Sequence, residues 1–310
     1  MKIAMLGAGA MGCIYGQYFS RHNEVLMIDV MKDHVDKINN DGLTFIHLDG
    51  TTEVFKNLRA TTDTSGEQPY DLVVLLTKGY QSAAALQANA SIIGPETIVL
   101  SLQNGYGNAD DIVKYVPESQ IVLGTSAGGA IVKGPGFIQH TGQGATHLGC
   151  LTEDQSKAEI VAKLMIEGGV PGVELTPNVK ELIWSKVIVN CGINPICAIT
   201  GMRNHTIVDD KFSNQVSYML VKEAVEIANA TGCNFDFEKE WANVQAVALA
   251  TGPNICSMLA DVNHKRKTEV DRINGAPVSE GAKVGLKAPL NELIVALIHA
   301  KETAYNDPDK

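Results

Sequence analysis

Short apolar runs alternate with helix-like segments along the first half of the chain. The runs cover residues 3–6, 25–28, 72–76, 98–102 and 121–123, and polar or glycine residues follow them. Strands separated by helices are typical of βαβ units, whose strands pair in parallel. The pattern therefore predicts an α/β domain with a parallel sheet, and ligands of such sheets bind outside the carboxyl ends of the strands. We expect Lys78, Asn104 and the 124–130 loop to face that edge.

The pattern changes at about Pro177. Gly134-Pro135-Gly136 marks a turn before this point, and the alternation over 146–149 predicts antiparallel edge strands. Long amphipathic stretches then follow at 179–199, 214–230, 237–249 and 290–305, and a helix is expected to begin near Ile255. We predict two domains, 1–178 with the sheet and 179–310 all-helical, and a frayed end at 306–310.

Composition excludes several classes of protein. A chain of 310 residues exceeds the size of most single cores, and a net charge of −10 disfavours a nucleic-acid surface. We find no run of about 18 apolar residues and no signal peptide, so we expect no membrane span and a cytoplasmic protein. The six cysteines form neither a C-x-x-C pair nor a metal-ligand spacing, which predicts buried, reduced thiols and no metal site.

The first apolar run ends in a glycine motif. Gly7-Ala8-Gly9-Ala10-Met11-Gly12 links this predicted strand to a helix-compatible segment, and Asp29 ends the next run. Gly7 allows a tight turn, Gly9 lets a pyrophosphate approach the backbone, and Gly12 lets helix and strand pack closely. This context favours a Rossmann dinucleotide-binding domain over a glycine-rich turn without a ligand.

A polar stripe crosses an apolar helix in the second half. Lys186, Asn190 and Asn194 have i, i+4, i+8 spacing and therefore share one helix face. Buried asparagines need partners, so the stripe indicates a pocket wall, although a solvated face is the alternative. A second polar cluster contains Ser257 and Glu269, and by spacing alone a surface face is the simpler interpretation.

These motifs together resemble the ketopantoate reductases. The resemblance rests on the glycine loop, Lys78, Gln103-Asn104-Gly105, Lys186-x3-Asn190-x3-Asn194-Pro195, Ser257-Met258-Leu259 and the segment 268–275, and it spans nearly the whole chain. It implies an N-terminal Rossmann domain and a C-terminal helical domain. The active site would lie in the cleft between these domains, where a nicotinamide cofactor delivers hydride to a 2-oxo acid.

The resemblance also assigns roles to residues. It implies Lys186 as the proton donor, and Glu269 bordering the reacting centre on the cofactor side. Substrate-binding positions match Asn104, Asn190, Asn194, Asn204 and Ser257, and cofactor positions match residues 7–12, Lys78, Asn104, Ala130 and Glu269. Hydride addition to a ketone leaves an alkoxide, which a nearby ammonium can stabilise and protonate.

The chain departs from the family at three places. Asp29 is followed by Val30 where many members carry an arginine that binds the 2′-phosphate of NADP. A carboxylate there accepts hydrogen bonds from the ribose of NAD and repels that phosphate, so we predict NAD over NADP, although Lys32 could restore phosphate binding. Cys256 and Ala260 replace more polar residues and make the expected pocket less polar.

An NAD preference favours one branch of the superfamily. We predict a D-2-hydroxyacid dehydrogenase of the D-mandelate type, which acts on C3-branched 2-oxo acids, with an NADPH-dependent 2-dehydropantoate 2-reductase as the alternative. A decarboxylating hydroxyacid dehydrogenase and a non-enzymatic NAD-sensing module are further alternatives. The partners expected are a small 2-oxo or 2-hydroxy acid and a second copy of the chain in a homodimer, and no histidine is assigned a catalytic role.

Overall fold

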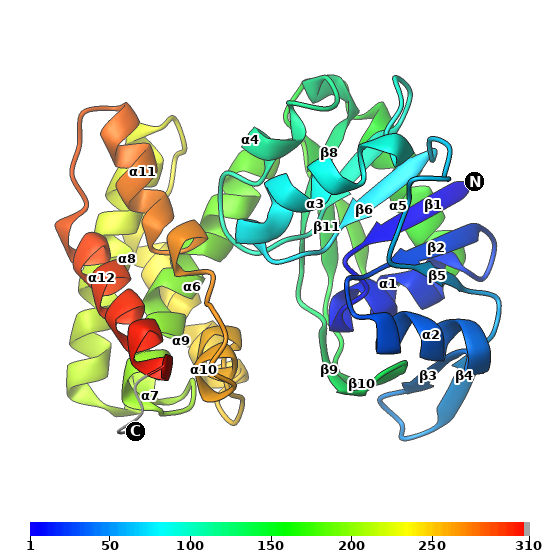
Figure 1. Cartoon of the computed structure of the whole chain (residues 1–310). Helices are drawn as coiled ribbons and strands as arrows, with labels where there is room; N and C mark the ends of the chain where they lie inside the picture. The colour runs from blue at the N-terminus through cyan, green and yellow to red at the C-terminus, as the bar shows by residue number, and fades with distance from the viewer. Residues whose placement is uncertain (307–310) are drawn as a thin grey trace. The chain divides into compact units, whose positions relative to one another are not determined.

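The computed structural model describes residues 1–306 and divides them into two compact units (Figure 1). Unit 1 comprises residues 1–103 and 108–182, and unit 2 comprises residues 104–107 together with the chain from Ile183 onward. The boundary falls inside a helix, four residues after the predicted one at 178/179. Of the expected frayed end, residues 307–310 lie outside the described part of the chain.

Unit 1 is built on a mostly parallel sheet. Within the described residues its strand order is β12-β11-β8-β7-β6-β1-β2-β5. The strands are β1 (Lys2–Leu6), β2 (Glu24–Ile28), β5 (Arg59–Thr61), β6 (Leu72–Leu75), β7 (Ile98–Ser101), β8 (Ile121–Ser126), β11 (Thr146–Cys150) and β12 (Val173–Leu175). The predicted Rossmann-type fold is confirmed. The antiparallel β8–β11 pair is also as predicted, although β12 lies outside β11 and forms the edge.

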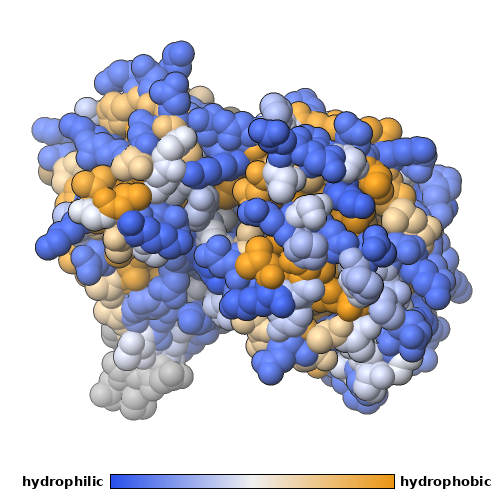
Figure 2. Space-filling model, turned by 90° about the horizontal axis from the view of Figure 1, so that it is seen from above, coloured by the Kyte–Doolittle hydropathy of each residue, from blue (hydrophilic) through white to orange (hydrophobic). Residues whose placement is uncertain are grey.

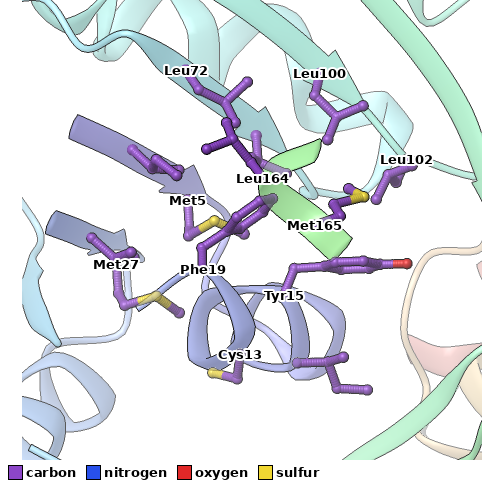
Figure 3. Close-up of a cluster of buried hydrophobic side chains, with 14 of the residues drawn as sticks. Met5, Cys13, Tyr15, Phe19, Met27, Leu72, Leu100, Leu102, Leu164 and Met165 are labelled. Atoms are coloured by element: carbon purple, nitrogen blue, oxygen red, sulfur yellow. The ribbon is translucent and has the colours of Figure 1, made fainter. Parts of the chain in front are cut away.

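Helices cover the two faces of this sheet because successive strand residues point to opposite sides. Met5, Leu72 and Leu100 point to one face, where they pack with Tyr15 and Phe19 of α1 (Ala10–Phe19) and Met165 of α5 (Ser156–Gly168) (Figure 3). Helices α3 (Ser82–Ala88) and α4 (Ala109–Ile112) cover the opposite face (Figure 1), to which the alternate strand residues point. The sheet is therefore buried on both sides, which explains its nearly continuous apolar runs.

A second, smaller sheet was not expected. Its order is β4-β3-β10-β9, with β3 (Leu43–Ile46), β4 (Thr52–Phe55), β9 (Gly129–Gly134) and β10 (Phe137–Gly142); α2 (Lys32–Asp41) precedes it. The prediction of a loop at 124–130 is therefore wrong, because β8 and β9 include all of these residues except 127 and 128. Gly124 is a strand residue: a Cβ there would lie 2.4 Å from the His147 carbonyl oxygen, so it permits close pairing with β11.

Unit 2 is helical, as predicted. Its longer helices are α6 (Val179–Thr200), α8 (Lys211–Ala230), α9 (Phe237–Ala250) and α12 (Pro289–Thr303), accompanied by the shorter α7 (Thr206–Asp209), α10 (Ser257–Asn263) and α11 (Gly275–Lys283). The helix expected near Ile255 begins two residues later, with Cys256 at its N-cap.

Helix α6 is the core helix around which unit 2 is assembled. Trp184, Ile188, Cys191 and Cys197 are each fully buried on it. Among the described residues it is also the one helix long and apolar enough to cross a membrane, although 67% of its most apolar window is buried inside the protein. A buried core helix passes the same test of length and composition. The face of the molecule in Figure 2 is largely hydrophilic, with apolar residues in separate patches.

The cysteines are structural in character. All six are buried with free thiols, as the spacing predicted. Burial raises the pKa of the Cys13 and Cys191 thiols well above the ordinary range. These two thiols are therefore protonated at neutral pH and act as small apolar groups with weak hydrogen-bond donors.

Candidate active site

The glycine loop of unit 1 has the conformation that its sequence predicts. Gly7 has φ +105°, and both Gly7 and Ala8 donate their N–H groups to the Ile28 carbonyl at 3.0 Å. A Cβ at Gly12 would lie 2.0 Å from the Gly7 carbonyl oxygen, so only glycine allows α1 to begin this close to β1. Both glycines are therefore required by the protein's own packing.

Gly9 differs from its two neighbours in the motif. A Cβ at this position would meet no atom within 4 Å, and its φ is −68°, so neither sterics nor backbone conformation requires a glycine here. Ala10 and Met11 follow at the start of α1, where backbone N–H groups have no partner within the helix. Space beside Gly9 and free donors at a helix N-terminus fit the pyrophosphate of a dinucleotide.

Asp29 lies at the carboxyl end of β2. Its Oδ1 accepts a hydrogen bond of 3.0 Å from the Met31 N–H, and this turn holds the carboxylate at the sheet edge. Val30 is 91% exposed, and the Lys32 ammonium lies 2.5 Å from Asp36 on α2. The cationic group nearest in sequence to Asp29 is thus already paired with an acid.

Two further predicted cofactor residues also belong to unit 1. Lys78 is partly buried and follows β6, at the N-cap of a short 3-10 helix. Ala130 lies on β9 and packs against the core of the unit. Lys78 thus follows the carboxyl end of β6 as expected, whereas Ala130 lies on a strand of the second sheet and not in the expected 124–130 loop.

The polar stripe is carried by α6 in unit 2. Lys186 and Asn190 are partly buried, Asn194 is 5% exposed, and the intervening Val187, Ile188 and Ile193 are buried. The stripe is thus flanked by buried apolar residues, and its interpretation as a pocket wall stays a prediction. Pro195 follows Asn194 and interrupts the hydrogen-bond ladder of the helix.

Lys186 has an unusual acid–base environment. Burial lowers its pKa to about 8, and the negative charge of Glu269 partly offsets this effect. Glu269 is itself 6% exposed and precedes a 3-10 turn, Val270–Arg272. An amine with a pKa near neutrality can both donate and accept a proton under physiological conditions.

Two other predicted substrate residues lie on separate elements of unit 2. Asn204 is buried and donates to Thr251 Oγ1 at 2.9 Å, while Ser257 is exposed at the first turn of α10. The adjacent Cys256 accepts from the Leu259 N–H at 3.4 Å and donates to the Asn194 carbonyl at 3.6 Å. A thiol therefore ties the start of α10 to the polar stripe.

Asn104 follows β7 of unit 1 in sequence, yet it belongs to unit 2. Residues 104–107 pack with the helical unit, where the Tyr106 N–H donates to the Arg272 carbonyl at 2.8 Å. Unit 2 thus holds Lys186, Glu269, Asn104 and the other predicted substrate residues, whereas the glycine loop, Asp29, Lys78 and Ala130 lie in unit 1. Sequence reasoning assigned no role to Arg272 and Asn274 of the segment 268–275, although they contact residue 107 and helix α6.

The histidines considered in the sequence contact neighbouring groups in both units. His205 pairs with Asp209 at 2.9 Å, His147 with Glu174 at 3.2 Å, and His264 contacts the Ala260 carbonyl. His140 is 8% exposed, and burial lowers its pKa. Within the described residues, no group of three or more His, Cys, Asp or Glu side chains could hold a metal ion.

A Rossmann-type unit with a dinucleotide-type glycine loop, joined to a helical unit with a partly buried amine, matches the class of NAD(P)-dependent oxidoreductases. Residues 3–153 match the model of the ketopantoate reductase PanE/ApbA family, and residues 178–302 match the model of its C-terminal domain. The chain belongs to this family.

Relatives match the chain over its whole length. The 2-dehydropantoate 2-reductase of Pyrococcus horikoshii is 35% identical over 304 residues, which cover 98% of each chain, and that of Streptococcus pyogenes serotype M1 is 33% identical over 99% of each. Among solved structures, D-mandelate dehydrogenase with NADH and anilino(oxo)acetate has a TM-score of 0.92 at 31% identity, covering 99% of each chain.

Proposed function

We propose that this protein reduces a C3-branched 2-oxo acid to the (R)-2-hydroxy acid, with 2-dehydropantoate as the substrate and NADH as the reductant. The observation that carries this proposal is Lys186, an enclosed amine with a pKa of about 8 in the same unit as Glu269 and the asparagine stripe. The substrate differs from the mandelate-type acid that the sequence alone favoured. The 2-dehydropantoate 2-reductases that match the whole chain support it.

The chemistry assigned to the protein is proton transfer and charge stabilisation. When bound, the reduced nicotinamide supplies a hydride to the ketone carbon. Lys186 then donates a proton from Nζ to the developing alkoxide, and its positive charge stabilises that oxygen as the charge forms. General acid catalysis of this kind contributes about 10²–10⁴-fold to the rate. Glu269 keeps enough positive charge on Lys186 for this role at neutral pH.

The substrate contacts are assigned to neutral amides and a hydroxyl. Asn190, Asn194 and Asn204 can donate to carboxylate and carbonyl oxygens without a charge that would compete with Lys186. Ser257 offers a further hydroxyl for the alcohol of 2-dehydropantoate, which simpler branched 2-oxo acids lack. A site built to bind that alcohol discriminates against analogues without it.

The preference for NADH over NADPH rests on unit 1. Asp29 places a carboxylate at the end of β2, and Lys32, the cationic residue nearest to it in sequence, pairs with Asp36. A carboxylate at this position repels the 2′-phosphate of NADPH and accepts hydrogen bonds from the ribose of NADH, and both effects favour NADH.

A second candidate is a D-mandelate-type dehydrogenase. Cys256 and Ala260 leave less polarity near Ser257 than the family pattern, which would suit an apolar substituent at C3. The solved D-mandelate dehydrogenase, crystallised with NADH, supports the same cofactor choice.

One set of kinetic measurements separates these possibilities. Steady-state rates are measured with NADH and with NADPH, each against 2-dehydropantoate, 2-oxoisovalerate and phenylglyoxylate. We expect the highest kcat/KM for 2-dehydropantoate with NADH. A preference for phenylglyoxylate would favour the mandelate-type enzyme, and a preference for NADPH would refute the argument from Asp29.

The Lys186→Ala variant tests whether the protein is an enzyme or an NAD sensor. We expect turnover to fall by about 10²–10⁴-fold while NADH affinity is retained. Unchanged turnover would remove Lys186 as the proton donor. NADH binding without turnover of any 2-oxo acid by the unmodified protein would favour the sensing module.

We further propose that the protein forms a homodimer through α8. Phe212, Val216 and Met219 have i, i+4, i+7 spacing and are 73%, 40% and 39% exposed, which makes an apolar stripe on the helix surface. Light scattering coupled to size-exclusion chromatography should give a dimer mass for the native chain and a monomer mass for Phe212→Glu. A monomeric native protein would refute this proposal.

A further inference from the structure

Residues 104–107 form a short loop that belongs to one unit while the elements on both sides of it in sequence belong to the other. The loop is bounded in sequence by β7 and α4, both in unit 1, but its four residues pack with unit 2. Asn104, the residue assigned to substrate and cofactor contact, is the first residue of this loop. Whatever fastens the loop to unit 2 therefore controls where Asn104 lies relative to Lys186.

Arg272 makes contacts at successive residues of the loop. Its backbone carbonyl accepts from the Tyr106 N–H at 2.8 Å, and its guanidinium Nη1 donates to the Gly107 carbonyl, also at 2.8 Å. Gly105 has φ +86°, and a Cβ there would lie 2.4 Å from the Arg272 carbonyl oxygen. The loop backbone thus lies directly against Arg272, with no room for a side chain at its closest point.

A ring contact fastens the loop to a second element. The rings of Tyr106 and Trp184 are 4.7 Å apart between centroids, with an interplanar angle of 33°. Trp184 is fully buried and precedes Lys186 by two residues on α6. Arg272 follows Glu269 by three residues, and its N–H donates to the Glu269 carbonyl at 3.0 Å. The loop is therefore attached to both segments that carry the proposed acid–base pair.

We propose that Arg272 is a positioning residue that fastens the 104–107 loop to unit 2 and so places Asn104 for the reaction. This inference rests on the proposed function for the role of Asn104, whereas the fastening itself follows from the contacts. Arginine suits the task because its planar, always charged guanidinium donates in a fixed direction, which an ammonium on a flexible stem does not reproduce. Asn104 then remains in one structural unit with Lys186 and Glu269.

A double-mutant cycle tests the proposal. Arg272→Met removes the guanidinium while retaining the length of the side chain, and we expect it to lower kcat/KM for the 2-oxo acid by about ten-fold. If Arg272 acts through Asn104, then adding Arg272→Met to Asn104→Ala should cause almost no further loss. Arg21→Met, at an exposed arginine of unit 1 that contacts Gln17 and Tyr18, is the matched control and should leave kcat/KM unchanged.

Hydrogen exchange provides a readout that does not depend on catalysis. The Tyr106 amide, which donates to the Arg272 carbonyl, should exchange faster in Arg272→Met than in Arg21→Met, and Arg272→Lys should restore part of the protection. Unchanged exchange, or additive losses in the cycle, would overturn the inference. Faster exchange with unchanged kcat/KM would overturn the positioning role. Failure of the unmodified protein to reduce any 2-oxo acid would refute the proposed function instead. The exchange data would then still show whether Arg272 holds the 104–107 loop on unit 2.

Discussion

The side-chain amide of Asn274 donates a hydrogen bond to the Cys191 carbonyl, 3.4 Å away. Pro195 lies four residues after Cys191 on α6 and has no N–H to donate, so this carbonyl lacks its usual helical partner. Asn274 supplies the missing donor. In the reverse direction the Cys191 thiol donates to the Ile273 carbonyl at 3.4 Å. The helix that carries Lys186 is thus bonded to the segment that carries Glu269.

Replacement of Asn274 should destabilise the protein strongly. Asn274 is fully buried and also donates to Asn291 Oδ1 at 2.9 Å, so Asn274→Ala leaves two buried acceptors without a donor. Each unsatisfied buried group costs about 1–3 kcal/mol, and we expect the free energy of unfolding in urea to fall by at least about 2 kcal/mol. The exposed Asn263→Ala is the control. A loss for Asn274→Ala as small as that of the control would contradict this account.

Two glycines of the nucleotide loop should respond differently to alanine. Gly12→Ala forces a Cβ onto the Gly7 carbonyl oxygen, so we expect a lower melting temperature and loss of the loop conformation. Gly9→Ala meets no protein atom, so the melting temperature should stay close to that of the native chain. NADH affinity should nevertheless fall by about ten-fold or more, because the methyl group fills the space assigned to the pyrophosphate. Calorimetric titration measures this, and native affinity in Gly9→Ala would place the phosphates elsewhere.

Much of the fold could be predicted because its signals are local. The buried strands β1, β6 and β7 are continuous apolar runs, and α8 and α9 have helical periodicity. The second sheet could not be predicted in this way, since β3 pairs with β10 about ninety residues further along the chain and β4 is mostly exposed. Its strands are stabilised by partners that are distant in sequence, and the short runs carry little signal of their own.

The residues of the candidate site also differ in whether their signal is local in sequence. Lys186, Asn190 and Asn194 share helix α6, and their spacing alone predicts that they lie on one face of it. Arg272 gains its importance from a loop more than 160 residues earlier, and nothing in its local sequence indicates this. Asn274 had one available signal, because Pro195 inside a long apolar helix implies a carbonyl that needs an outside donor.

Asp29 provides a test of cofactor choice. Asp29→Asn removes the charge but keeps a hydrogen-bonding side chain of the same size at the end of β2. We expect kcat/KM with NADPH to rise and kcat/KM with NADH to fall, each by about ten-fold, because repulsion of the 2′-phosphate is lost along with a charged acceptor for the ribose. Lys32→Ala is the control, since its ammonium already pairs with Asp36. A larger change in Lys32→Ala than in Asp29→Asn would assign the preference to the lysine.

The pH dependence of catalysis should report the state of Lys186. Its pKa of about 8 means that the ammonium needed for reduction is present below pH 8, so kcat/KM for the 2-oxo acid should fall as the pH rises above this value. Oxidation of the 2-hydroxy acid needs the neutral amine and should show the opposite trend. Because the negative charge of Glu269 raises the pKa of Lys186, Glu269→Gln should move both profiles to lower pH, whereas Asp271→Asn, at an exposed site two residues away, should leave them in place. A profile that is flat between pH 6 and 10, or an upward shift in Glu269→Gln, would refute the assignment of Lys186 as the proton donor.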